Sequence, residues 1–432
     1  MKLFFLSTVV FVTLLISFMN HGGIGNNTYA LIPITNEAEI YADIAKYNNS
    51  LALASHAGEP KIYGRVARSK LYGTFSDGGL LGFCNGGVHL TGSKQFTHQL
   101  SCYQTGKCQI YDRYESQSGG QAFIYSLINK FYGNPIIFRI FCASFLSAVL
   151  VFWFVWLYDY FGATSSLLIL LGILSFRSLM LLGDNIAHVF AATYLIMVAL
   201  FWTYKKKIKN VGTVAFFVVL LKLLLNGPEY LFSALLLPFL PLVFYAVLNK
   251  MSNKRILSNI LSISSGVLLA CLVSLLILMV QVSITTSSSE AIHHFINRIM
   301  ARTYFPNLLS DTHMHLTQRI NLLQLLHMYL SFPCLSIGSF QVSFNMIILF
   351  FFIISILAFH LFLRYQQRIL LALLITTWTS ILCPLSWILI AKGHSVVHTF
   401  VDQIIWHIPF TLLGITLTVV TLQTYIKKRL PE

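Results

Sequence analysis

Two imidazoles, a carboxylate and a cation lie close together near the end of the chain, in the stretch CPLSWILIAKGHSVVHTFVDQIIWHIPF (residues 383–410). If this loop is helical, one face carries four residues at four-residue spacing: His394, His398, Asp402 and Trp406. Lys392 and Gly393 directly precede them. Imidazoles and an ammonium at the junction of two apolar segments are suited to binding a phosphate.

A metal site is the alternative interpretation of the same residues. His394, His398 and Asp402 are ligands that zinc or manganese accepts, at spacings of four residues along a helix. One helix rarely supplies a complete coordination shell. We therefore predict no dedicated metal site, and the sequence names no cofactor beyond this alternative of a divalent metal.

The composition places this loop in a membrane protein. Hydrophobic residues make up 56% of the 432 and charged residues 10%, with a mean hydropathy of +0.73. We predict an all-α integral membrane protein with about ten transmembrane helices, because a span needs about 20 apolar residues. The expected spans are 3–19, 136–158, 163–182, 186–203, 211–226, 230–248, 258–285, 343–363, 369–391 and 404–425.

The formal net charge of +15 indicates topology, since the cations gather in short loops. These loops hold Lys205–Lys209, Lys250–Arg255, Arg364–Arg368 and Lys427–Arg429. Cytoplasmic loops carry an excess of Lys and Arg, so both termini are predicted in the cytoplasm. No nucleic-acid-binding pattern, P-loop or dinucleotide turn accompanies the charge, and no nucleic-acid partner is expected.

The spans divide the chain into three regions. Residues 1–19 form a first span or signal anchor, 20–134 an exported α or α+β domain, and 135–432 the helical bundle, with a second exported loop at 286–342. The exported domain offers four candidate catalytic carboxylates. These are Glu37, Glu39, Asp77 and Glu115.

Three cations lie inside expected spans near the exported side: Arg139, Arg177 and Lys222. A charge at the centre of a bilayer costs about 2.5–3.5 kcal/mol, so such residues face a cavity or extend to the headgroups. Short exported turns also carry Asp184 and Glu229, although a tight turn needs no carboxylate.

Cations below carboxylates at an outer membrane boundary suit transfer of a sugar from a lipid phosphate. Arg139, Arg177, Lys222, Lys392, His394 and His398 are the expected donor-phosphate ligands. They would stabilise the charge that develops on the leaving phosphate. An exported carboxylate would accept the proton of a polar acceptor, which is a glycan, a lipid or a protein. The expected donor is a polyprenyl phosphate-linked sugar held among membrane lipids.

The chain resembles the GT-C superfamily of polytopic membrane glycosyltransferases. The resemblance lies in a first span, a large exported loop and a long bundle, and in SQSGGQAFIYSL, NGPEYLFSALLLPFLPLVFY and SWILIAKGHSVVHT, which are similar to segments of bacterial membrane proteins. It implies a location in a bacterial inner membrane. Members usually carry an acidic pair soon after the first span, whereas Glu37 and Glu39 here are separated by one residue. The base therefore stays open among the four carboxylates.

Two other function classes fit the same pattern. Ionisable residues inside a bundle also mark the substrate path of a transporter or channel. A polymerase or ligase of surface polysaccharide would use the same lipid-linked donors. The scarcity of acids and histidines toward the inner face, and the lack of an internal repeat, favour the transferase over the transporter.

Overall fold

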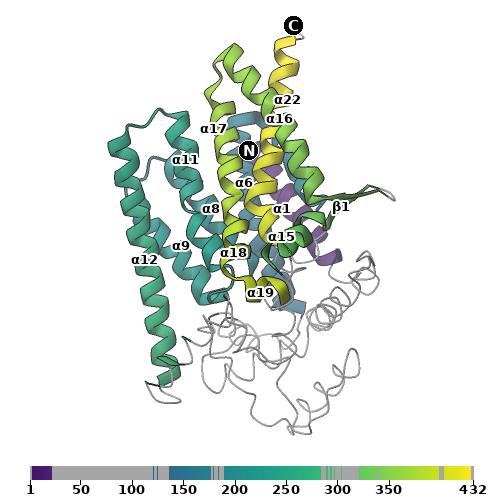
Figure 1. The fold of residues 1–432 in the computed structure, drawn as a ribbon. Helices are drawn as coiled ribbons and strands as arrows, with labels where there is room; N and C mark the ends of the chain where they lie inside the picture. Colours follow the sequence, from purple (N-terminus) through teal and green to yellow (C-terminus); the bar gives the residue numbers. More distant parts are fainter. Residues whose placement is uncertain are drawn as a thin grey trace.

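The apolar segments of the sequence fold into helices packed side by side in a bundle (Figure 1). The computed structural model describes residues 2–21, 136–176, 189–283, 321–337, 340–397 and 403–429, together with positions 120, 124, 179, 183, 289, 292–293, 296 and 303. Helices suit apolar runs because they satisfy every backbone hydrogen bond within one segment.

The first half of the bundle contains α1 (Lys2–His21), α6 (Ile136–Leu174), α8 (Phe190–Lys205), α9 (Val211–Asn226), α10 (Leu231–Leu236), α11 (Phe239–Leu248) and α12 (Asn253–Ser283). The second half contains α15 (Leu322–Ser331), β1 (Pro333–Ile337), β2 (Phe340–Ser343), α16 (Phe344–Tyr365), α17 (Arg368–Ser380), α18 (Leu382–Ile390), α19 (Lys392–Val397), α21 (Ile404–Trp406), the π-helix η5 (His407–Thr411) and α22 (Leu412–Arg429).

Within the described residues, six helical segments are long and apolar enough to cross a membrane. They are Ile140–Leu174, Leu231–Leu248, Asn253–Val280, Phe344–Tyr365, Arg368–Ile390 and Ile404–Arg429. The prediction of an α-helical membrane protein is therefore confirmed. The other four expected spans correspond to α1, the second part of α6, α8 and α9, which are shorter, so the full count of ten stays a prediction.

Gly162 divides α6 into two arms. Its backbone has φ 79° and ψ 176°, a conformation that glycine adopts without a Cβ clash. In the second arm, the Ser165 hydroxyl donates to Gln423 Oε1 at 2.7 Å, and two residues after the end of α6 the centre of the Phe176 ring lies 4.7 Å from that of His407. As the chain advances from Ser165 to Phe176, its contact in the last span moves back from Gln423 to His407. The second arm of α6 and α22 therefore run antiparallel.

The first arm of α6 runs alongside α8 in the same direction. The Trp202 indole donates to the Phe152 carbonyl at 3.0 Å, and further along both helices Lys205 forms an ion pair with Asp159. α8 and the last span begin at the same end of the bundle, because the Tyr194 hydroxyl near the start of α8 donates to the carbonyl of Ile404 in α21, which leads into α22. The arms of α6 therefore run in opposite directions, as the separate spans 136–158 and 163–182 predict.

These contacts define two ends of the bundle. The basic end contains the turns 159–165, 204–210, 249–255 and 364–368 and the C-terminal turn of α22 (Figure 1). There Lys428 Nζ lies 5.4 Å from the centre of the Tyr365 ring, which joins the α16–α17 turn to α22. The site end contains the turn 226–230 and the segments 383–397 and 403–407.

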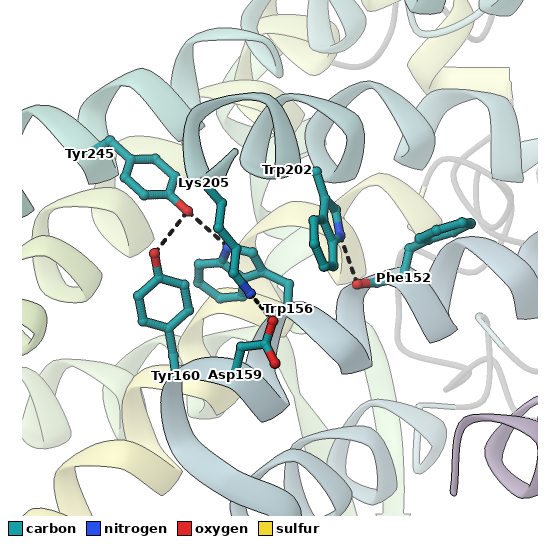
Figure 2. A network of polar contacts seen from close by, with 7 residues as sticks. All are labelled: Phe152, Trp156, Asp159, Tyr160, Trp202, Lys205 and Tyr245. Atoms are coloured by element: carbon teal, nitrogen blue, oxygen red, sulfur yellow. Dashed lines mark hydrogen bonds and ion pairs between the residues drawn. The ribbon is translucent and has the colours of Figure 1, made fainter. Parts of the chain in front are cut away.

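An aromatic network closes the basic end (Figure 2). The Tyr245 hydroxyl accepts a hydrogen bond from the Trp156 indole at 3.0 Å and lies 3.1 Å from the Tyr160 hydroxyl. The ammonium of Lys205, paired with Asp159, lies 5.3 Å from the centre of the Tyr160 ring. Aromatic residues and lysines concentrate at membrane–water interfaces, so this end has the character of an interface.

Within the predicted exported loop 286–342, the described residues between 322 and 343 form a short helix and a β-hairpin instead of one continuous helix. α15 ends at Ser331, and β1 and β2 form an antiparallel hairpin before α16. Pro333 explains the change, because a proline has no N–H to continue the helix and restricts the residue before it to extended conformations. Phe332 accordingly has φ −65° and ψ 134°.

Candidate functional site

A buried ammonium organises the first turn of the site end. The Lys222 side chain has no exposed surface, and its Nζ donates to the Gly227 carbonyl at 2.8 Å and to the Glu229 carbonyl. Both carbonyls belong to the turn directly after α9, and a cation near the C-terminus of a helix is favourable. Lys222 therefore stays inside the protein at the end of α9 and does not extend into the headgroups.

The same turn is fixed to α8 by an amide. The side chain of Asn226 accepts from the Val189 backbone N–H and donates to the Val189 carbonyl, both at 2.9 Å. Glu229, two residues after Gly227, is 2% exposed. A carboxylate and an ammonium are thus buried in one turn, which is the kind of placement that marks functional sites.

α10 and α18 hold this turn against the stretch that follows α18. The Ser233 hydroxyl donates to the Cys383 carbonyl at 2.7 Å, and the Tyr230 ring lies 5.3 Å from the Trp387 ring. α18 ends at Ile390, two residues before Lys392. The turn of Lys222 and the start of α19 therefore belong to one packed unit.

α19 is short and is held by its backbone. The Gly393 N–H donates to the Thr303 carbonyl at 2.8 Å, and the Tyr329 hydroxyl of α15 donates to the Ser395 carbonyl at 3.0 Å. Lys392, the first residue of α19, is half-buried, and burial lowers the pKa of its ammonium from the usual value. A phosphate beside Lys392 would oppose this effect by stabilising the charged form.

The chain re-enters the bundle through an interrupted helix. Gln403, Trp406 and His407 are all fully buried, and Ile408 has φ −131° and ψ 107° between α21 and α22. Pro409 explains the interruption, because it cannot donate to the carbonyl four residues earlier and its ring clashes with that carbonyl. The expected span 404–425 is present as Ile404–Arg429, but it is not one regular α-helix.

Of the ten predicted site residues, the structure places the side chains of two, Lys222 and Lys392. Arg139 lies in α6 and His394 in α19, where only the backbone is described. The remaining predictions lie outside the described residues, namely Glu37, Glu39, Asp77, Glu115, Arg177 and His398. Lys222 and Lys392 both lie at the site end, on the two stretches that Ser233 and Tyr230 fasten together.

The metal alternative also falls largely outside the described residues. His398 and Asp402 are not described, and only the backbone of His394 is. Within the described part of the chain, no group of three or more His, Cys, Asp or Glu side chains could hold a metal ion.

Sequence reasoning missed two buried polar residues, Gln403 and His407. A signal was available, since Pro409 interrupts the expected span and both residues lie within six positions of it. A proline inside an apolar segment indicates a break, and side chains beside a break are free to face the bundle interior.

Comparison of the chain with protein-family models, with curated proteins and with solved structures finds no match in any of the three. The resemblance to GT-C glycosyltransferases thus stays a prediction, and a functional proposal has to rest on the geometry of the site end.

Proposed function

We propose that the chain is a membrane glycosyltransferase that takes its sugar from a polyprenyl phosphate at the site end of the bundle. The observation that carries this proposal is the packing of α10, which follows the turn of Lys222, against α18, which ends two residues before Lys392. Lys222 donates to the carbonyls of the turn, whereas Lys392 is half-buried at the start of α19. An ammonium at the end of an apolar bundle is suited to a lipid phosphate, whose tail lies among the helices.

The reaction moves one glycosyl group. An acceptor oxygen or nitrogen attacks the anomeric carbon, the bond from that carbon to the phosphate oxygen breaks, and polyprenyl phosphate leaves with the electron pair. A carboxylate takes the acceptor proton, and Glu37, Glu39, Asp77 and Glu115 are the candidates for this role. Lys392 stabilises the negative charge on the leaving phosphate.

The proposed orientation puts the basic end in the cytoplasm and the site end outside, with ten crossings. It is supported by the gathering of Lys205–Lys209, Lys250–Arg255, Arg364–Arg368 and Lys427–Arg429 at one end. Cysteines introduced one at a time at 204–210 should resist an impermeant maleimide in intact cells, whereas those at 292 and 293, which are exposed positions of the predicted outer loop 286–342, should react. Labelling of 204–210 from outside would reverse the orientation and remove the outer active site.

A transfer assay tests the function directly. Purified protein in liposomes receives radiolabelled polyprenyl phosphate hexoses or pentoses, with envelope glycan and lipid fractions as acceptors. We expect transfer from at least one donor, its loss in Lys392→Ala, and its retention in Lys207→Ala, which removes an exposed lysine at the basic end. Equal transfer by the two variants would refute the role of Lys392.

Transport is the second candidate, and the interruption of the last span favours it. Discontinuous helices with buried polar side chains form the substrate sites of many transporters, and Gln403 and His407 flank such a break. The same liposome assay distinguishes the two functions. A transporter would move an intact labelled solute across the bilayer, whereas the transferase releases polyprenyl phosphate and leaves a glycosylated product.

A further inference from the structure

Gln403 and Trp406, at the start of the last span, bury polar atoms that have no hydrogen-bond partner in the part of the chain that is described. These atoms are both side-chain amide atoms of Gln403 and the indole Nε1 of Trp406. Both side chains have no exposed surface. Burying a polar group without a partner forfeits its hydration, so native proteins rarely leave several together. A bound group that supplies the missing partners would account for them.

The two side chains belong to one turn. The Trp406 backbone N–H donates to the Gln403 carbonyl at 3.0 Å, and residues three apart on a helix lie on the same side. The Phe344 ring of α16 lies 5.4 Å from the Trp406 ring, and the Tyr194 hydroxyl of α8 bonds to the Ile404 carbonyl between them. Two neighbouring helices therefore enclose this turn.

The described groups define a ligand chemistry. The amide of Gln403 both donates and accepts, and the indole of Trp406 only donates, so the pair suits hydroxyl groups, which also do both. The aromatic rings of Trp406 and Phe344 add an apolar surface beside them. A few neutral polar groups against aromatic walls are characteristic of sites that orient an uncharged ligand.

We propose that Gln403 and Trp406 bind hydroxyl groups of the sugar carried by the donor. This inference rests on the proposed function and deepens it, because it separates recognition of the sugar from recognition of the phosphate by Lys392. Lys392 begins α19, and Gln403 directly precedes α21, which holds Trp406. Gln403 then selects the donor by its sugar, and Lys392 binds the phosphate that all donors share.

The test compares two identical substitutions. Gln403→Met removes the amide at nearly constant length. Gln423→Met makes the same change in α22, where Gln423 accepts a hydrogen bond from Ser165 at the far end of that helix. Binding of farnesyl phosphate and of farnesyl phosphate esterified to mannose, glucose, galactose, N-acetylglucosamine or arabinose is measured on the purified full chain, together with thermal unfolding without ligand.

We expect the wild type to bind at least one sugar conjugate about tenfold more tightly than bare farnesyl phosphate, a difference of about 1.4 kcal/mol. Gln403→Met should abolish this preference and leave binding of the bare phosphate unchanged, while Gln423→Met retains both. Without ligand, Gln403→Met should unfold at the wild-type temperature or above it, because it removes an unpaired amide. Gln423→Met should unfold at a lower temperature, because Ser165 loses its acceptor.

Several results would overturn the inference and leave the phosphate site standing. One is equal affinity of the wild type for bare and sugar-bearing phosphates, and another is a sugar preference that survives Gln403→Met. The third is a lowered unfolding temperature in Gln403→Met, which would show that internal water or protein groups satisfy the amide. Failure of the proposed function has a different signature. In that case the wild type binds neither farnesyl phosphate nor any conjugate.

Discussion

Replacing Gly266 by alanine should separate two helices that touch through their backbones. A Cβ at Gly266 in α12 would lie 2.1 Å from the carbonyl oxygen of Gly212 in α9, and a Cβ at Gly212 would lie 2.4 Å from the carbonyl oxygen of Ser262. A carbon and a carbonyl oxygen come no closer than about 3.3 Å in ordinary backbone contacts. The helices would therefore have to move apart by about 1 Å at this crossing.

The net cost follows from two opposing effects. Overpacking typically costs about 1–3 kcal/mol, and here the obstacle is backbone, so we take the upper value. Alanine gains back about 1 kcal/mol over glycine in a helix. We expect Gly266→Ala to lower stability by about 2 kcal/mol. Close approach through small residues is a common way for membrane helices to associate, since lipid gives them no hydrophobic drive to pack.

Gly172→Ala is the matched control. Its Cβ would meet the Cγ2 atom of the Ile415 side chain at 2.9 Å, and a side chain can rotate away where a backbone cannot. The steric cost and the helical gain should then nearly cancel. Thermal unfolding of both variants in detergent, followed by size-exclusion chromatography, measures the difference. Equal unfolding temperatures for Gly266→Ala and Gly172→Ala would refute the backbone contact between α9 and α12.

Three further predictions concern other described contacts. Tyr245→Phe should lower the free energy of unfolding by about 1–3 kcal/mol, because it leaves buried donors unpaired. Asp159→Asn should lower it by under about 1 kcal/mol, because that carboxylate is 38% exposed. The reverse order in thermal unfolding would contradict the network of Figure 2. Lys222→Met should lower the free energy of unfolding by about 3 kcal/mol, because two charge-assisted hydrogen bonds are lost. Lys209→Met, at an exposed position, is the neutral control, and equal stability of the two variants would place the Lys222 ammonium elsewhere. Burial raises the pKa of Cys334 to about 12, so between pH 7 and 9 a variant with this single cysteine should react with maleimide only after denaturation, and rapid native labelling would refute its burial.

The sequence predicted the helices because apolar runs bounded by turn residues and lysines have one stable structure in lipid. The expected span 211–226 coincides with α9, and Gly162 falls in the expected break between 158 and 163. Breaks inside spans were missed. α10 and α11 separate at Pro238, and the last span is interrupted at Ile408, because tertiary packing rather than hydropathy decides whether a proline bends or breaks a helix.

The candidate site was predicted less completely, since a helix that is apolar all round does not reveal which face is buried. Lys222 was identified as a cation near the outer boundary, but its contact with the carbonyls of Gly227 and Glu229 depends on the path of the turn. Gln403 gave no periodic signal at all. Its importance follows only from burial, which is a property of the packed bundle.

The position of a bound polyprenyl phosphate tests the central claim most directly. Cryo-electron microscopy of the protein in nanodiscs with farnesyl phosphate would locate the phosphate density. We expect it beside Lys392, at the end of α18, with the tail running into the bundle toward the basic end. Density beside Lys206–Lys209 at the basic end, or lipid density only along the outer face of α12, would contradict a donor site at the site end.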